Sequence, residues 1–145
     1  KLRFSKINQD VDDLNKEYKK IKNTPVNILI RTSRWLKKYG LYISSATPEN
    51  EIVQIAKLRK IFDYFKGVYG SPISKHEHVK KIIKSNNYKE TEVIFIGDST
   101  SDRDAANENN IRFIARIING ISPLKDEMNK IVDLVVLENL IQSLV

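Results

Sequence analysis

Short apolar runs alternate along this chain with segments of helical periodicity, and this alternation limits the folds that the chain can adopt. The runs have the length and the β-branched content of buried strands, and they lie at residues 41–45, 93–96, 112–117 and 131–136. Segments with apolar residues at helical spacing separate or follow them, at about 48–62, 75–85, 102–109 and 137–144. Strands that alternate with helices predict an α/β fold, with a mostly parallel sheet and helices on both faces.

Local signals place several boundaries. The first part of the chain predicts two helices, at 9–23 and 27–39, and Gly40 suits the left-handed position that ends the second. Thr47 followed by Pro48 predicts the N-cap and the first residue of the next helix. Residues 65–69 predict a short element that leads the chain back and ends at Gly70.

Composition excludes several classes of protein. The chain has 145 residues, enough for one domain, and 41% of them are hydrophobic, which is enough for a core. It contains no cysteine, so disulfides and cysteine-ligated zinc are excluded. No apolar run is long enough to span a membrane and no secretory signal is visible. We therefore expect a cytoplasmic protein with no membrane partner.

The formal net charge of +7 raises nucleic acid as a partner. The lysines are scattered, however, and the cluster Lys80, Lys81 and Lys84 fits the solvent face of one helix. We therefore favour a solvated surface over a nucleic-acid interface. The positive charge can still attract a small phosphorylated metabolite.

Polar residues follow two of the predicted strands at their carboxyl ends, where ligands bind in sheets of this kind. Ser45 and Ala46 end the first strand, and Asp98 follows the strand at 93–96, with Asp102 four residues later. Lys75 opens the helix that lies between these strands in the sequence. The Ser45 hydroxyl and the Ala46 amide can donate to a phosphate, and Lys75 can neutralise its transition-state charge. The two carboxylates are ligands that magnesium prefers.

Each of these residues alone has a plainer interpretation. Ser45 can cap a helix, Lys75 can be a surface lysine, and Asp102 can be a first-turn acid favoured by the helix dipole. His76 and His78 flank the lysine motif two residues apart, so they form a poor metal pair, and we expect both to face solvent. The joint pattern is what indicates a site.

Three segments in order resemble motifs two, three and four of the haloacid dehalogenase-like superfamily, in its phosphoglycolate phosphatase and phosphoglucomutase-like branch. They are LYISSATPEN, GSPISKHEHVKKII and EVIFIGDSTSDRDAA. The resemblance implies a Rossmann-like core and a magnesium-dependent phosphatase. It also implies that Ser45 binds phosphate, that Lys75 is the motif-three lysine, and that Asp98 and Asp102 bind Mg2+.

The first motif of that superfamily, an apolar strand ending in Asp-x-Asp that carries the nucleophile, has no clear counterpart. The sequence Asp10-Val11-Asp12 lies in a segment of helical period, with no apolar strand before it. We therefore expect residues 1–24 to be the end of a helical cap. Residues 25–145 would then be the C-terminal part of the core, without its motif-one strand.

This interpretation predicts that the chain is a fragment of a phosphatase that hydrolyses a small phosphate monoester through an aspartyl-phosphate intermediate. The fragment alone would be inactive, and its partner would be the N-terminal segment of the same parent protein. Because the missing strand would lie between the strands that end at Ser45 and Asp98, either another segment fills that place or the sheet is split there. A phosphotransferase or sugar-phosphate mutase, or a catalytically silent binding or regulatory module, remains an alternative.

Overall fold

The computed structural model describes residues 39–117, 122–132 and 136–144. The predicted helix at 9–23 and all but the last residue of the one at 27–39 lie outside this part. The main elements run in the order β1 (Tyr42–Pro48), α3 (Glu49–Leu58), β2 (Gly67–Ser71), α4 (Lys75–Asn86), β3 (Ile94–Gly97), α5 (Thr100–Glu108), β4 (Arg112–Arg116), β5 (Lys130–Ile131) and α6 (Leu137–Leu144). Strands and helices alternate, so the predicted α/β class is confirmed.

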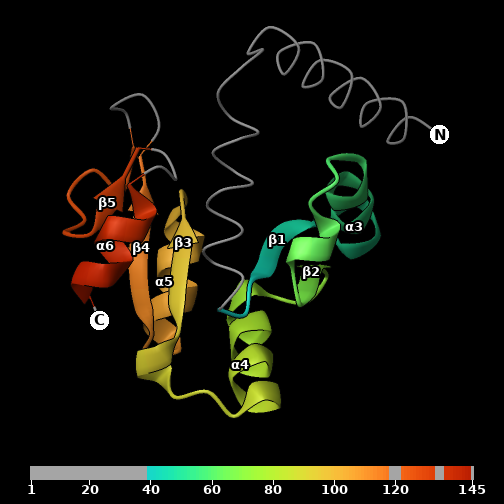
Figure 1. The fold of residues 1–145 in the computed structure, drawn as a ribbon, viewed down its shortest axis with the longest axis horizontal. Coiled ribbons are helices and arrows are strands. Elements are labelled where there is room, and N and C mark those ends of the chain that lie inside the picture. The colour runs from blue at the N-terminus through green and yellow to red at the C-terminus, as the bar shows by residue number, and fades with distance from the viewer. Residues whose placement is uncertain (1–38, 118–121, 133–135, 145) are drawn as a thin grey trace, which may run out of the picture.

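The described strands form two parallel sheets and not one (Figure 1). β1 pairs with β2, and β3 pairs with β4, which pairs in turn with β5. Within the described residues β1 and β3, the strands that carry the predicted site, do not pair with each other. The break between the two described sheets therefore lies between these strands, and the absence of a motif-one strand stays a prediction.

Helices cover both faces of the second sheet (Figure 1). Successive side chains along each strand point to opposite faces, so each strand contributes to two clusters. Ile94, Ile96 and Ile114 pack with Leu137 and Ile141 of α6.

On the opposite face Phe95 and Phe113 pack with Val79 of α4, Ala106 of α5 and Ile111. This second cluster joins α4 to the β3–β4–β5 sheet, so the helix that carries Lys75 packs against the sheet in which Asp98 follows β3.

Some predicted boundaries are wrong. β1 continues through Thr47, and Pro48 occupies the N-cap position of α3 without a side-chain cap, so Thr47 is not the cap. α5 begins at Thr100 and not at Asp102, because Ser99 is its N-cap. A strand is predicted at 131–136, but β5 ends at Ile131, so the described residues after Ile131 do not continue the strand.

Candidate functional site

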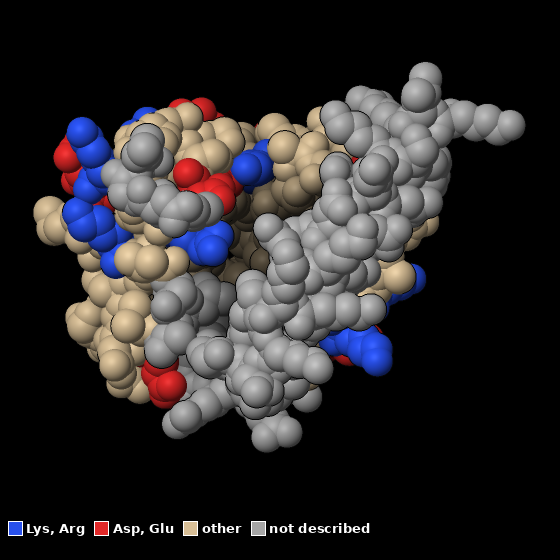
Figure 2. Space-filling view, turned by 90° about the horizontal axis from the view of Figure 1, so that it is seen from above, with Lys and Arg blue, Asp and Glu red and all other residues tan. Residues whose placement is uncertain are grey.

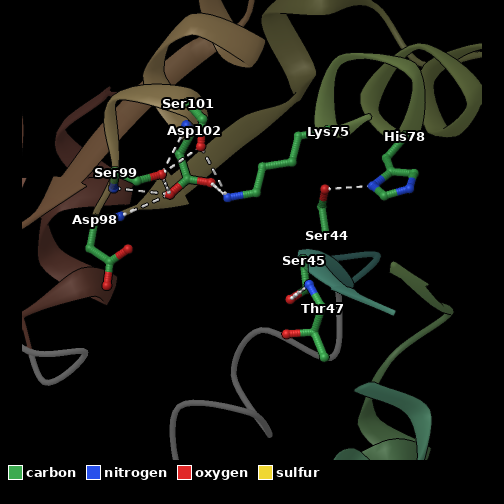
Figure 3. Close-up of polar contacts among 9 residues, drawn as sticks. All are labelled: Ser44, Ser45, Thr47, Lys75, His78, Asp98, Ser99, Ser101 and Asp102. Carbon is green, nitrogen blue, oxygen red and sulfur yellow. Dashed lines mark hydrogen bonds and ion pairs between the residues drawn. The ribbon is translucent and has the colours of Figure 1, made fainter. Parts of the chain in front are cut away.

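Lys75 is the first residue of α4, and the sequence before it fixes where that helix begins. The Ser74 hydroxyl caps the helix by accepting a hydrogen bond from the Glu77 amide at 3.2 Å. The capped first turn directs the Lys75 side chain toward the start of α5 (Figure 3).

The ammonium of Lys75 forms an ion pair with Asp102, with 2.5 Å between Nζ and Oδ1. The side chains are 18% and 7% exposed, so the pair is largely removed from water. Lys75 Nζ also lies 3.4 Å from the Ser101 hydroxyl. The structure therefore brings together two residues that are 27 positions apart and that the sequence predicts to share a site.

The other carboxylate oxygen of Asp102 organises the loop between β3 and α5. Its Oδ2 accepts hydrogen bonds from the amides of Asp98 and Ser99, at 3.2 and 3.0 Å, and from the Ser99 hydroxyl at 2.7 Å. Ser99 Oγ in turn lies 3.2 Å from the Asp102 amide, which completes a capping box at the start of α5. Asp102 is thus both a first-turn acid and the partner of Lys75.

These contacts set the charge of Asp102. Burial opposes ionisation of the carboxyl, but the hydrogen bonds from Lys75 and Ser99 outweigh it and lower the pKa of Asp102 below its ordinary value. The group is therefore a carboxylate at neutral pH, paired with a cation.

Gly97, the last residue of β3, leaves room for this carboxylate. A Cβ at Gly97 would lie closer than 3.0 Å to Cβ, Cγ and Oδ2 of Asp102. The glycine of the Gly-Asp pair is explained by this close approach.

Asp98 is exposed, and its carboxylate points away from Lys75 and Asp102 (Figure 3). No hydrogen bond or ion pair to that carboxylate is formed within the described part of the chain, which leaves both oxygens available to a ligand. The described residues contain no group of three or more acidic, histidine or cysteine side chains that could hold a metal. Magnesium needs one or two carboxylates and takes waters and phosphate oxygens for the rest, so Asp98 fits one side of such a site.

Ser45 and Ala46 lie near the end of β1, and the structure does not bring Ser45 into contact with Lys75 or Asp102 (Figure 3). The Ser45 hydroxyl accepts a hydrogen bond from the Thr47 amide at 3.1 Å, which leaves its own hydrogen free to donate. Ala46 is exposed.

The prediction that His78 faces solvent is wrong, since His78 is 1% exposed. Its ring lies 2.8 Å from the Ser44 hydroxyl and 3.1 Å from the Gly70 carbonyl oxygen. His78 is four residues before the buried Ile82, so it shares the inward face of α4, and that spacing could have identified it. His76 is partly exposed, with Glu108 at 3.1 Å.

Acidic and basic side chains lie next to each other at a hollow on the face seen in Figure 2, which looks down on the end of the molecule where β3 ends.

The model of the family described as haloacid dehalogenase-like hydrolase matches residues 2–116, more than half of the chain. The chain belongs to this family. The search of curated proteins found no match.

Solved structures show the same fold. A haloacid dehalogenase-like family hydrolase from Streptococcus pneumoniae is 23% identical, with a TM-score of 0.66, over 76% of this chain and 57% of that one. A HAD-superfamily hydrolase from Ehrlichia chaffeensis is 24% identical, with a TM-score of 0.66, over 79% and 56%. A predicted phosphatase from Clostridium acetobutylicum is 24% identical, with a TM-score of 0.66, over 81% and 60%. This chain therefore matches little more than half the length of these relatives.

The described helices of this haloacid dehalogenase-like hydrolase include none that is long and apolar enough to cross a membrane. Its Rossmann-like core holds Lys75, Asp98 and Asp102 near one another, with Ser45 on β1.

Proposed function

We propose that this chain is the C-terminal part of a magnesium-dependent phosphatase core that hydrolyses a small phosphate monoester. The observation that carries the proposal is the Lys75–Asp102 ion pair, with Asp98 on the loop before α5, where its carboxylate has no partner among the described residues. The ammonium of Lys75 and the carboxylate of Asp98 provide the two charges that a phosphate with its counter-cation requires.

Each residue has a role in this proposal. Lys75 neutralises negative charge that develops on the phosphoryl oxygens, and Asp102 pairs with the ammonium and holds it at the site. Ser45 donates its free hydroxyl hydrogen to a phosphate oxygen, assisted by the Ala46 amide. Mg2+ would be held by Asp98, and Asp102 would be the second acid that binds it. When bound, the ion would screen the charge of the phosphate.

The nucleophile would be an aspartate on a strand that lies between β1 and β3. Its carboxylate oxygen would form a bond to phosphorus as the ester oxygen leaves, and water would then cleave the aspartyl phosphate. Asp10 is not proposed for this role, because the sequence around it has helical period. Residues 1–24 would be the end of a helical cap, and residues 25–145 the core without its motif-one strand.

The relatives support the class of substrate. One is described as a predicted phosphatase, and the core domain of a candidate phosphoglycolate phosphatase from Streptococcus pneumoniae has a TM-score of 0.63 over 83% of this chain and 88% of that one. From these names and the charges of the site we infer a small phosphorylated metabolite as the substrate.

The test is a phosphatase assay with an aryl phosphate and magnesium, on the longer protein that contains this chain and an Asp-x-Asp strand. Lys75→Met should reduce kcat by about a hundredfold or more, and Lys80→Met, on the exposed face of the same helix, is the matched control. Equal activity of the two variants would rule out the role of Lys75. Absence of turnover in the unaltered longer protein would rule out the proposed function.

A further inference from the structure

His78 connects three segments of the site region. It lies on α4, one turn after Lys75, and its Nδ1 lies 2.8 Å from Ser44 Oγ on β1. Its Nε2 lies 3.1 Å from the carbonyl oxygen of Gly70 on β2. The ring also stacks on Tyr69, with 5.5 Å between centroids and 29° between planes.

The partners fix the tautomer of the ring. A carbonyl oxygen can only accept, so His78 Nε2 carries the hydrogen and donates it to Gly70. In the neutral ring Nδ1 is then an acceptor, and the Ser44 hydroxyl donates to it. Both ring nitrogens and the Ser44 hydrogen are therefore committed to fixed partners.

The surroundings favour this neutral form. Burial lowers the pKa of His78, and the nearby ammonium groups of Lys81 and Lys75 act in the same direction. The hydrogen bond to Gly70 and the charge of Glu49 on α3 oppose them but do not prevail. Lys81 also lies over the ring of Tyr69, at 5.1 Å from its centroid.

Ser44 precedes Ser45, so the two side chains leave opposite faces of β1. The hydrogen bond from Ser44 to His78 fixes β1 against α4. It therefore also fixes the position of the Ser45 side chain, on the opposite face of β1. The same imidazole lies one helical turn from Lys75. Its two bonds thus set the spacing between the hydroxyl and the ammonium that we assign to phosphate.

We propose that His78 is a positioning residue, a neutral imidazole that ties α4 to the ends of β1 and β2 and so holds Lys75 and Ser45 in register for one phosphate. The proposal rests on the proposed function, because it concerns the same phosphate site. His78 itself does not touch the substrate.

The first measurement is the 15N resonances of the His78 ring in the 145-residue chain. We expect the neutral Nε2–H tautomer throughout the range from about pH 6 to 8. Ser44→Ala should move the Nδ1 resonance, because it removes the donor to that nitrogen. An Nδ1–H tautomer, or a ring that is cationic at neutral pH, would overturn the proposal.

The second measurement compares two substitutions of His78, one that keeps an aromatic ring and one that keeps a hydrogen-bond acceptor. His78→Phe keeps an aromatic ring against Tyr69 but makes neither bond, whereas His78→Asn keeps an acceptor near the position of Nδ1. We expect His78→Phe to weaken the nuclear Overhauser effect between the side chains of Lys75 and Asp102. We also expect it to lower the affinity for inorganic phosphate with Mg2+ by about tenfold. His78→Asn should restore both to within about threefold of the original chain.

A folded His78→Phe chain that keeps both signals would overturn the proposal. If that variant does not fold, Ser44→Ala decides, since it should weaken the same two signals while the imidazole stays in place. If the unaltered chain binds no phosphate, the proposed phosphate site is wrong, and the contact between Lys75 and Asp102 in the variants still decides the role of His78.

Discussion

Replacing Lys75 with methionine should destabilise the chain as well as impair the site. The substitution keeps the length of the side chain and removes the cation 2.5 Å from Asp102 Oδ1. Breaking a buried ion pair costs about 3–5 kcal/mol. Here Asp102 keeps three hydrogen bonds to Oδ2 and the Lys75 side chain is 18% exposed, so we expect a loss of about 2 kcal/mol.

The dependence on pH follows from the lowered pKa of Asp102. A carboxyl whose pKa is lower in the folded state contributes stability above its unfolded pKa, and loses that contribution as the pH falls through the folded pKa. The difference in the free energy of unfolding between the original chain and Lys75→Met should therefore be largest at neutral pH. It should shrink once the pH falls below about 3.9, the ordinary value for aspartate.

The assay is urea denaturation followed by circular dichroism, at neutral pH and at the lowest pH at which the chains remain folded. Lys80→Met, on the exposed face of α4, is the control and should change the free energy of unfolding by less than about 0.5 kcal/mol. A Lys75→Met chain as stable as this control at neutral pH would refute the reasoning. If the loss of stability in Lys75→Met is the same at neutral pH and at the lowest pH measured, the assignment of the effect to Asp102 is refuted.

Three further substitutions test the loop and the strand end. Gly97→Ala places a methyl group against Asp102 and should cost about 1–3 kcal/mol of stability in the same urea assay, so an unchanged midpoint would contradict the packing. Asp98→Asn, at an exposed carboxylate, should change stability by less than about 0.5 kcal/mol, yet it should abolish most turnover in the longer protein and weaken magnesium binding measured by calorimetry. Ser45→Ala removes one hydroxyl donor and should reduce kcat in that protein by about 10–1000-fold, and a normal kcat would remove Ser45 from the site.

Much of the fold and the site can be predicted from the sequence, because the signals are local. The apolar run before Asp98 predicts β3, and the helical pattern that opens at Lys75 predicts α4 to within a residue. The interpretation of Asp102 as a first-turn acid is confirmed, since Asp102 lies in the first turn of α5.

The remainder depends on contacts between distant segments. Periodicity cannot reveal that Asp102 pairs with Lys75, because that contact depends on how α4 packs beside α5. The helical spacing of His78 to Ile82 indicates its inward face, but its partners Ser44 and Gly70 lie on two other elements and cannot be found from that spacing. The pairing of strands into two sheets is equally non-local.

The most direct test of the proposed function is an aryl phosphatase assay of the 145-residue chain with magnesium, alone and together with the Asp-x-Asp segment of its parent protein. We predict no hydrolysis above background for the chain alone, and turnover when the segment that carries the nucleophile is supplied. Robust hydrolysis by the chain alone would contradict the proposal that the nucleophile lies on a strand outside this chain.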